Sequence, residues 1–256
     1  MSADIVLKVA GVSKRFGGLQ ALSDVGITIQ RGQVYGLIGP NGAGKTTFFN
    51  VITGLYTPDS GSFELAGKPY QPTAVHEVAK AGIARTFQNI RLFAEMTALE
   101  NVMVGRHVRT HSGILGAIFR TRAFREEEAV IAKRAQELLD YVGIGKYADY
   151  RARTLSYGDQ RRLEIARCMM TRPRILMLDE PAAGLNPKET EDLKALIAML
   201  RDKHDVTVLL IEHDMHLVMS ISDHIYVINQ GTPLADGTPE QIRNNPDVIK
   251  AYLGEA

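Results

Sequence analysis

The stretch "GPNGAGKTT" at residues 39–47 decides the fold of this chain. It follows "QVYGLI", an apolar run typical of a buried strand, and leads into "FFNVITGL", whose apolar residues have helical spacing. A glycine-rich loop between a strand and a helix lets backbone N–H groups surround phosphate oxygens. The stretch therefore predicts a phosphate-binding loop at the carboxyl end of a strand.

Each residue type in this loop has a use in phosphate binding. The glycines let the backbone approach the phosphates, the Lys45 ammonium reaches the outer phosphates, and the Thr46 hydroxyl can ligate Mg²⁺. A fortuitous glycine turn is disfavoured because the flanking strand and helix are both present. The predicted nucleotide-binding residues of the loop are Gly39, Pro40, Asn41, Gly42, Ala43, Gly44, Lys45, Thr46 and Thr47.

Further strands flank the loop on both sides. Short strands are expected at 5–12 and 25–29, and a turn-rich piece at 57–69 predicts a hairpin in an antiparallel sheet. Near-continuous apolar runs at 174–180 and 206–214 are typical of central parallel strands covered on both faces. Between these runs Asn186 is expected to cap a helix, with Pro187 in its first turn and Glu189 three residues after the cap.

A mainly helical segment interrupts this alternation. Thr97 and Glu100 form a capping-box pattern, and an apolar stripe at 131–142 stops at Gly143. We therefore expect an α/β fold with a doubly wound core, an antiparallel β subdomain and an inserted helical subdomain. The core with its β subdomain is assigned to 1–87 and 156–256, and the helical subdomain to 88–155.

Two acids follow the strand at 174–178. Asp179 could hold Mg²⁺ or its water ligands, and Glu180 comes directly after it. Because adjacent residues at a strand end point in different directions, one carboxylate can face a metal and the other an attacking water. A solvated turn is the alternative, and the phosphate loop makes it the weaker one.

Three more side chains are placed where strands end. His213 follows one strand and Gln88 another, at the edge where ligands bind in parallel sheets. His213 and His216 could also ligate a metal, but no third ligand lies nearby in the sequence. Phe16 could stack on a base, although an aromatic residue after a strand is more often part of the core.

A second anion site is predicted in "LSYGDQRRLEIARC" at 155–168. Ser156 and its neighbours precede a segment whose apolar residues Leu163, Ala166 and Met170 recur at helical spacing. Helix N-termini attract anions. The chain therefore carries two candidate anion sites.

Composition restricts the classes of partner. Thirty basic and twenty-nine acidic residues give a net charge of +1, so no bulk electrostatic attraction to nucleic acid is expected. The single cysteine, Cys168, excludes an internal disulfide and is expected to be a small buried hydrophobe. No signal-peptide pattern and no long apolar run are present, so we expect a soluble intracellular protein.

Together these motifs resemble the nucleotide-binding subunit of ABC transporters. The phosphate loop, the glutamine of "FQN", the signature "LSYGDQ", the acidic "ILMLDEP" and the histidine of "IEHD" occur in that family's order over essentially the whole chain. The stretches at 89–102, 180–193 and 229–256 are similar to the larger ATPase subunit of branched-chain amino-acid importers.

The resemblance implies a role for each candidate residue. ATP and Mg²⁺ are the implied cofactors, with Phe16 stacking on adenine, Gln88 sensing Mg²⁺ and the attacking water, and Asp179 and Thr46 on the metal. Glu180 would polarise the attacking water and His213 would contact the γ-phosphate. Ser156, Gly158 and Gln160 would close over the nucleotide of a partner cassette.

The resemblance also implies partners. These are a second ATPase subunit in a heterodimer or homodimer, two membrane-spanning permease subunits reached through residues 89–96, and, indirectly, an external solute-binding protein; nucleic acid is not among them. The chain would lie at the cytoplasmic face of a bacterial plasma membrane. Tyr157, Asp159 and Asn186 depart from the family's common residues, which puts coupling between the two nucleotide sites in question.

Several alternatives remain open. A urea or amide importer, an exporter, or a soluble ABC ATPase acting on DNA or ribosomes would share these motifs, whereas a P-loop kinase or GTPase would leave the signature unused. The segment 107–125 is either an amphipathic helix with solvated arginines or a surface whose Arg120 and Arg122 face lipid headgroups.

Overall fold

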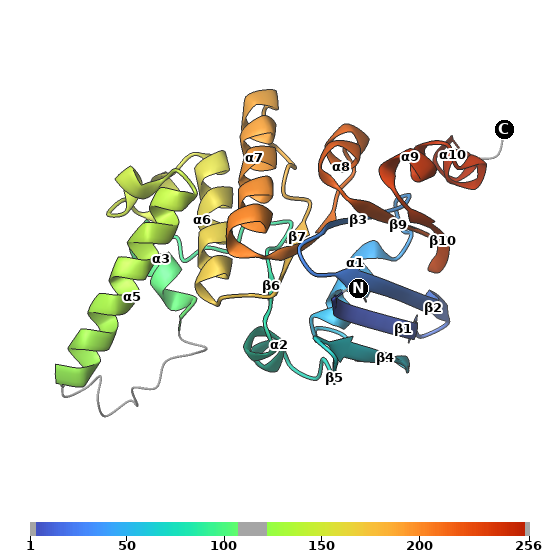
Figure 1. Cartoon of the computed structure of the whole chain (residues 1–256), viewed down its shortest axis with the longest axis horizontal. Helices are drawn as coiled ribbons and strands as arrows, with labels where there is room; N and C mark the ends of the chain where they lie inside the picture. The colour runs from blue at the N-terminus through green and yellow to red at the C-terminus, as the bar shows by residue number, and fades with distance from the viewer. Residues whose placement is uncertain (1–3, 107–121, 254–256) are drawn as a thin grey trace. The chain divides into compact units, whose positions relative to one another are not determined.

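The computed structural model describes residues 4–106 and 122–253, which belong to two compact units (Figure 1). The first unit comprises Met1–Arg85 and Arg174–Ala256, and the second comprises Thr86–Pro173. Arg120, the side chain of Arg122 and most of the segment 107–125, for which two interpretations are open, lie outside the described residues. Within the described ranges, no helix combines the length and the apolar character that a membrane span requires.

A six-stranded sheet forms the centre of the first unit. Its order is β10-β9-β3-β8-β7-β6; β9, β3, β8, β7 and β6 are parallel, and β10 runs antiparallel to β9. The strands are β3 (Val34–Ile38), β6 (Ile83–Arg85), β7 (Ile175–Asp179), β8 (Thr207–Ile211), β9 (His224–Asn229) and β10 (Thr232–Gly237). Every residue of β3, β7 and β8 is buried, so the apolar runs are central strands and the predicted α/β fold is confirmed.

An antiparallel sheet of order β2-β1-β4-β5 forms the rest of the first unit's strand structure. Its strands are β1 (Ile5–Phe16), β2 (Leu19–Gln30), β4 (Ser60–Leu65) and β5 (Lys68–Pro69). The first two are longer than expected because they form one hairpin in which pairing continues to the Phe16–Leu19 pair beside the turn. The hairpin predicted at 57–69 is confirmed by the pairing of Leu65 with Lys68.

One apolar core joins the two sheets through the first helix. Phe48, Phe49 and Ile52 of α1 are fully buried in the same cluster as Leu7 of β1 and Leu37 of β3. The helices of this unit are α1 (Lys45–Ile52), α2 (Val75–Ala81), α7 (Pro187–His204), α8 (Met215–Ile221), α9 (Pro239–Arg243) and α10 (Pro246–Leu253). The phosphate loop therefore leads into a helix that is fixed along its length by the core.

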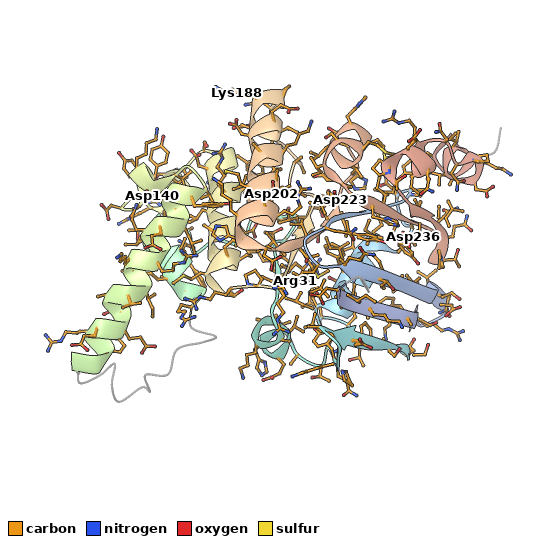
Figure 2. The ribbon with its side chains drawn as sticks, viewed as in Figure 1. Arg31, Asp140, Lys188, Asp202, Asp223 and Asp236 are labelled. Atoms are coloured by element: carbon orange, nitrogen blue, oxygen red, sulfur yellow. The ribbon has the colours of Figure 1, made fainter. Side chains whose placement is uncertain are left out.

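Polar side chains brace the amino end of β3 (Figure 2). The carboxylate of Asp223 accepts a hydrogen bond from the backbone N–H of Val34 at 2.8 Å. The Tyr35 hydroxyl donates to Asp236 at 3.1 Å, and the same carboxylate lies 2.7 Å from the His224 ring. These contacts tie β3 to β9 and β10, which fixes the strand whose other end carries the phosphate loop.

The second unit is helical. It contains α3 (Ala98–Val104), α5 (Arg122–Tyr141), two short 3₁₀ turns, η2 (Gly145–Tyr147) and η3 (Ala152–Thr154), and α6 (Tyr157–Met170). The predicted capping box is confirmed, since Thr97 accepts from the N–H of Glu100 and Glu100 accepts from the N–H of Thr97. Burial raises the pKa of the Cys168 thiol to about 12, which fits the small buried hydrophobe that we expected.

The division between the units differs from the predicted one at its second boundary. Residues 156–173, assigned from sequence to the core, group with the helical unit. The physical reason is that α6 bonds within that unit: the Arg162 guanidinium donates to Val142 O at 3.1 Å, and Arg161 holds the backbone of residues 87–88. The motif "LSYGDQ" thus starts a helix of the second unit.

The cap of α7 gives a first prediction. The Asn186 side chain accepts from the N–H of Glu189 at 3.0 Å, and Glu189 accepts from the N–H of Asn186 at 2.9 Å. Replacing Asn186 by Ala removes this acceptor and is expected to cost about 1 kcal/mol, which lowers Tm by about 2–4 °C for a chain of this size. Thermal unfolding followed by near-ultraviolet circular dichroism measures it. Asn186→Asp, which keeps the acceptor, is the control, and equal melting of both variants would contradict the assignment.

Candidate functional site

A cavity of about 550 Å³ in the first unit contains most of the predicted site residues. It lies at the carboxyl end of β3, where the phosphate loop begins. Its lining combines the loop with side chains from the antiparallel sheet and from the loops after β7 and β8. The lining residues are Phe16, Leu19, Gln20, Ala21, Asn41, Gly42, Ala43, Gly44, Lys45, Thr46, Thr47, Glu180, His213, Gln230 and Gly231.

Lys45 holds the phosphate loop in a closed curve. Its ammonium donates to the carbonyl oxygens of Gly39 and Pro40, at 2.7 and 2.9 Å. Burial lowers the pKa of Lys45, and the nearby Glu180 carboxylate partly opposes that effect. Because α1 starts at Lys45 and its N-cap residue is Gly44, no side chain caps the first turn, whose N–H groups are available to an anion.

Backbone hydrogen bonds join this loop to the turn after β9, and that turn to β2. The N–H of Gly231 donates to Ala43 O at 2.9 Å, and the N–H of Ser23 donates to Gly231 O at 2.7 Å. Gly44 has a φ of 102°, and a Cβ there would lie 2.8 Å from Ala21 O. The glycine at this position is therefore required both by its conformation and by the approach of β2.

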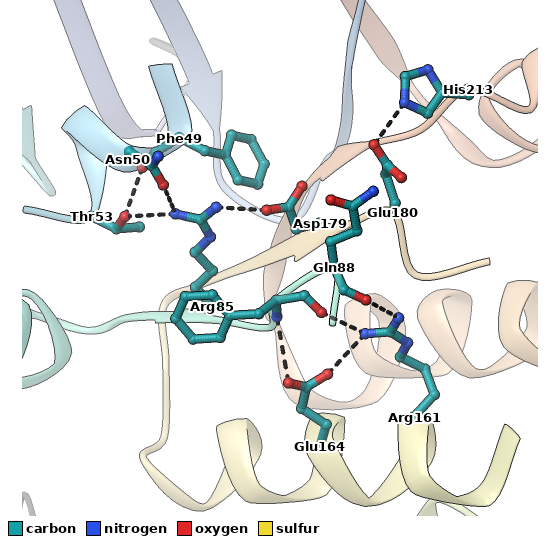
Figure 3. Close-up of polar contacts among 11 residues, drawn as sticks. Phe49, Asn50, Thr53, Arg85, Gln88, Arg161, Glu164, Asp179, Glu180 and His213 are labelled. Atoms are coloured by element: carbon teal, nitrogen blue, oxygen red, sulfur yellow. Dashed lines mark hydrogen bonds and ion pairs between the residues drawn. The ribbon is translucent and has the colours of Figure 1, made fainter. Parts of the chain in front are cut away.

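Glu180 and His213 face each other across the end of the parallel strands (Figure 3). The Glu180 Oε1 and the His213 Nε2 lie 2.6 Å apart, within hydrogen-bond distance. Glu180 has a φ of 47°, a left-handed conformation that residues with a Cβ rarely adopt, and its N–H donates to Ile211 O at 2.9 Å. The backbone is thus held in a strained form that turns this carboxylate into the cavity, where it can accept a proton.

Glu212 holds the two loops that carry Glu180 and His213 together. It was not predicted from the sequence. Its buried carboxylate accepts from the N–H of Ala182 at 2.7 Å and of His213 at 3.1 Å, which links the loop after β7 to the loop after β8. Burial raises the pKa of Glu212, and these backbone donors oppose the rise. An acid at the end of a buried strand was the available signal.

Asp179 takes a different direction from Glu180, as the strand geometry predicts. Asp179 is 4% exposed, does not line the cavity, and forms an ion pair of 2.6 Å with Arg85 (Figure 3). Thr46 and Asp179 offer hydroxyl and carboxylate oxygens, the donor atoms that suit Mg²⁺. The described residues contain no cluster of three or more acids, histidines or cysteines that could hold a metal ion.

The second unit contains the remaining predicted residues, Gln88, Ser156, Gly158 and Gln160. Ser156 is the N-cap of α6: its hydroxyl accepts from the N–H of Asp159 at 3.1 Å and donates to the Asp159 carboxylate at 2.8 Å. Gln160 donates to Leu155 O at 3.0 Å, and Gly158 is buried. The helix N-terminus predicted at "LSYGDQ" is confirmed.

A buried arginine fixes Gln88 to this helix. The Arg161 guanidinium donates to Phe87 O at 2.7 Å and to Gln88 O at 2.9 Å, and it forms a 2.9 Å ion pair with Glu164 (Figure 3). Glu164 in turn accepts from the N–H groups of Phe87 and Arg91. Side chains of α6 therefore hold the backbone at Phe87 and Gln88.

Arg161 of this pair also contacts Tyr157, one of the residues that depart from the signature of the family that the chain resembles. The hydroxyl of Tyr157 accepts a hydrogen bond from Arg161 at 3.3 Å. This ion pair was not predicted from the sequence. Opposite charges three residues apart on a helix indicate a contact, but not its burial.

Known proteins resemble the chain over nearly its full length. A model of the family described as ABC transporter matches residues 22–183, and one described as branched-chain amino acid ATP-binding cassette transporter matches residues 232–256. The chain is 62% identical over 251 residues to the high-affinity branched-chain amino acid transport ATP-binding protein BraF of Pseudomonas aeruginosa, and the match covers 98% of each protein. It is 55% identical to LivG of Escherichia coli, named for the same kind of transport, again over 98% of each.

Solved structures agree with these matches. The ADP conformation of an ATP-binding cassette of an ABC transporter has a TM-score of 0.84 at 32% identity, covering 98% of this chain and 99% of the other. A nucleotide-free cassette from an ABC transporter also has a TM-score of 0.84 at 32% identity, covering 98% of this chain and 100% of the other.

The Arg161–Glu164 pair gives a second prediction. Arg161→Met leaves the Glu164 carboxylate buried without its cation, and we expect the free energy of unfolding to fall by about 3–5 kcal/mol. Denaturant unfolding of the full chain, followed by helical circular dichroism, measures this loss. Arg161→Met with Glu164→Gln should lose less than the two single variants combined, because the double variant leaves no charge unpaired. Strictly additive losses would show that the two side chains do not interact.

Proposed function

The chain belongs to the ABC transporter family, and from this we propose that it is the ATP-hydrolysing subunit of an importer for branched-chain amino acids. It is an ABC-type ATPase with a nucleotide-binding core. The observation that carries the choice of solute is the 62% identity, over 98% of both chains, with a protein named for high-affinity branched-chain amino acid transport. The cavity around the phosphate loop supplies the physical site for the nucleotide.

Within this proposal the cavity binds ATP. The loop N–H groups and Lys45 hold the phosphates, and the exposed ring of Phe16 stacks on adenine. Glu180, turned into the cavity and within hydrogen-bond distance of His213, accepts a proton from the attacking water. His213 keeps that carboxylate in place and reaches the γ-phosphate.

Mg²⁺ belongs to the same proposal. Thr46 and Asp179 would hold the ion or its water ligands. The role of Gln88, which would sense the ion and the attacking water, is proposed from the family resemblance. When bound, the ion neutralises charge on the phosphate oxygens. The protein's part is to keep these oxygen donors oriented.

The second anion site, at the N-terminus of α6, would function in a dimer of two ATPase subunits. Ser156, Gly158 and Gln160 at the start of α6 would close over the nucleotide of a partner ATPase, because a single exposed helix N-terminus contributes only about 0.3–1 kcal/mol by itself. We propose a different ATPase subunit as that partner, two membrane-spanning permease subunits, and an external solute-binding protein acting through them. The chain would then lie peripherally at the cytoplasmic face of a bacterial plasma membrane.

The role of Glu180 gives the third prediction. Glu180→Gln removes the proton acceptor but keeps the shape, so we expect ATP hydrolysis to fall by about 10²–10⁴-fold with ATP binding retained. Lys45→Ala should instead weaken binding, since it removes the cation that faces the phosphates. Fluorescent-nucleotide titration and phosphate release separate the two effects. Near-normal hydrolysis by the Glu180→Gln protein would remove this residue from the role of base.

The choice of solute gives the fourth prediction. The tagged chain, isolated from membranes in mild detergent, should be recovered with a second ATPase and with permease subunits. In the reconstituted complex, a binding protein loaded with leucine, isoleucine or valine should raise ATP turnover above that with the empty binding protein. Stimulation only by a urea or amide receptor would move the proposal to another importer. An isolated monomer that hydrolyses ATP at full rate, regardless of its concentration and of changes at Ser156, would contradict the dimeric site.

A further inference from the structure

A buried arginine of the first unit contacts Asp179, the carboxylate proposed to serve Mg²⁺. Arg85, the last residue of β6, is 6% exposed at its side chain, and its guanidinium lies 2.6 Å from Asp179 Oδ2 (Figure 3). The Asp179 side chain is buried to a similar degree, with 5% of its surface exposed. The two charges therefore meet in an environment where solvent screens them little.

The same guanidinium contacts the helix that follows the phosphate loop. It donates to Asn50 Oδ1 at 2.6 Å and to Thr53 Oγ1 at 3.1 Å, and its central carbon lies 5.4 Å from the ring centroid of Phe49. The Thr53 hydroxyl donates to Phe49 O at 2.7 Å, so its oxygen is turned to accept from Arg85. Arg85 thus spans the end of α1 and the carboxyl end of β7.

This geometry depends on an arginine. The planar guanidinium presents several N–H donors in fixed directions, whereas a lysine ammonium is a single point charge on a flexible stem. Buried ion pairs contribute little net stability, because desolvation of both charges offsets their attraction. A stability role alone therefore gives a weak reason for placing this cation next to Asp179.

We propose that Arg85 is the positioning residue of the metal site, holding the Asp179 carboxylate in a fixed direction and tying it to the end of α1. The inference rests on the proposed function, in which Asp179 serves Mg²⁺. Thr46, the other oxygen donor, lies in the first turn of this eight-residue helix. Arg85 therefore fixes the two metal-side elements to each other, and its contacts with Asn50 and Thr53 are part of that task.

The test uses Mn²⁺ as a spectroscopic probe in place of Mg²⁺. The full chain carrying Glu180→Gln, which is expected to retain ATP, is titrated with Mn²⁺ in the presence of ATP, and free Mn²⁺ is measured by electron paramagnetic resonance. ATP affinity in EDTA is measured separately. Arg85→Met is expected to weaken Mn²⁺ binding by about 10–100-fold, the usual loss when a group that orients a metal ligand is removed. Arg85→Lys should recover only part of the lost Mn²⁺ affinity, because a lysine restores the charge but lacks the fixed N–H donors of the guanidinium.

Controls separate positioning from folding. Arg201→Met removes an arginine of α7 whose ion-pair partners are Asp202 and Asp223, both labelled in Figure 2. None of the three lines the cavity, so this variant should leave Mn²⁺ affinity unchanged. Asn50→Ala keeps the Arg85–Asp179 pair and removes one tie to α1, so it should weaken Mn²⁺ binding less than Arg85→Met does. This milder variant also keeps the proposal testable if Arg85→Met fails to fold.

The outcomes distinguish this inference from the proposed function. Unchanged or tighter Mn²⁺ binding in both Arg85 variants overturns it, as does a parallel loss of ATP affinity in EDTA, which would make Arg85 merely structural. Asp179→Asn should itself weaken Mn²⁺ binding, and adding Arg85→Met to it should cause no further loss. If Asp179→Asn binds Mn²⁺ normally, the metal role of Asp179 fails and the inference fails with it. If the Arg85 variants bind Mn²⁺ normally but Asp179→Asn does not, the inference about Arg85 fails and the proposed function is unaffected.

Discussion

The close packing of three backbone segments around the phosphate loop is the constraint on which the nucleotide site depends. A Cβ at position 39 would overlap Ile228 O, and one at position 231 would lie 2.6 Å from Ala21 O. With glycine at both places, the loop, β2 and the turn between β9 and β10 approach closely enough to share backbone hydrogen bonds. The loop is thereby fixed by main-chain contacts, which leaves its N–H groups and Lys45 oriented before any ligand binds.

Buried arginines perform a comparable task on each side of the division between the units. Arg85, the last residue of the first unit's N-terminal segment, holds Asp179 and the end of α1, while Arg161 in the second unit holds the backbone at Gln88. Only Thr86 and Phe87 separate Arg85 from Gln88 in the chain. Each unit therefore anchors its own end of this connection through a guanidinium, whose several donors can satisfy a carboxylate and neighbouring oxygen acceptors at once.

The sequence predicted those parts of the site whose geometry is local. The phosphate loop, the caps at Thr97, Ser156 and Asn186, and the divergence of Asp179 from Glu180 follow from spacing along one element. Arg85, Arg161 and Glu212 were missed because their roles are set by partners brought close by tertiary structure. The boundary near residue 156 was misplaced for the same reason, since the helix after Ser156 is held by side-chain bonds that its own periodicity does not reveal.

A polyanion bound in this cavity would offset the cost of burying the charged Lys45. Lys45 is 6% exposed, and its ammonium donates to two carbonyl oxygens. Burial nevertheless lowers its pKa, so the charged form is disfavoured there relative to water. A phosphate group beside it would offset that cost through a direct charge contact, in a site where solvent screens little. Glu180 already offsets part of it, as its opposing effect on the pKa of Lys45 shows. A bound phosphate and the Glu180 carboxylate would therefore both favour the charged form of this one buried cation.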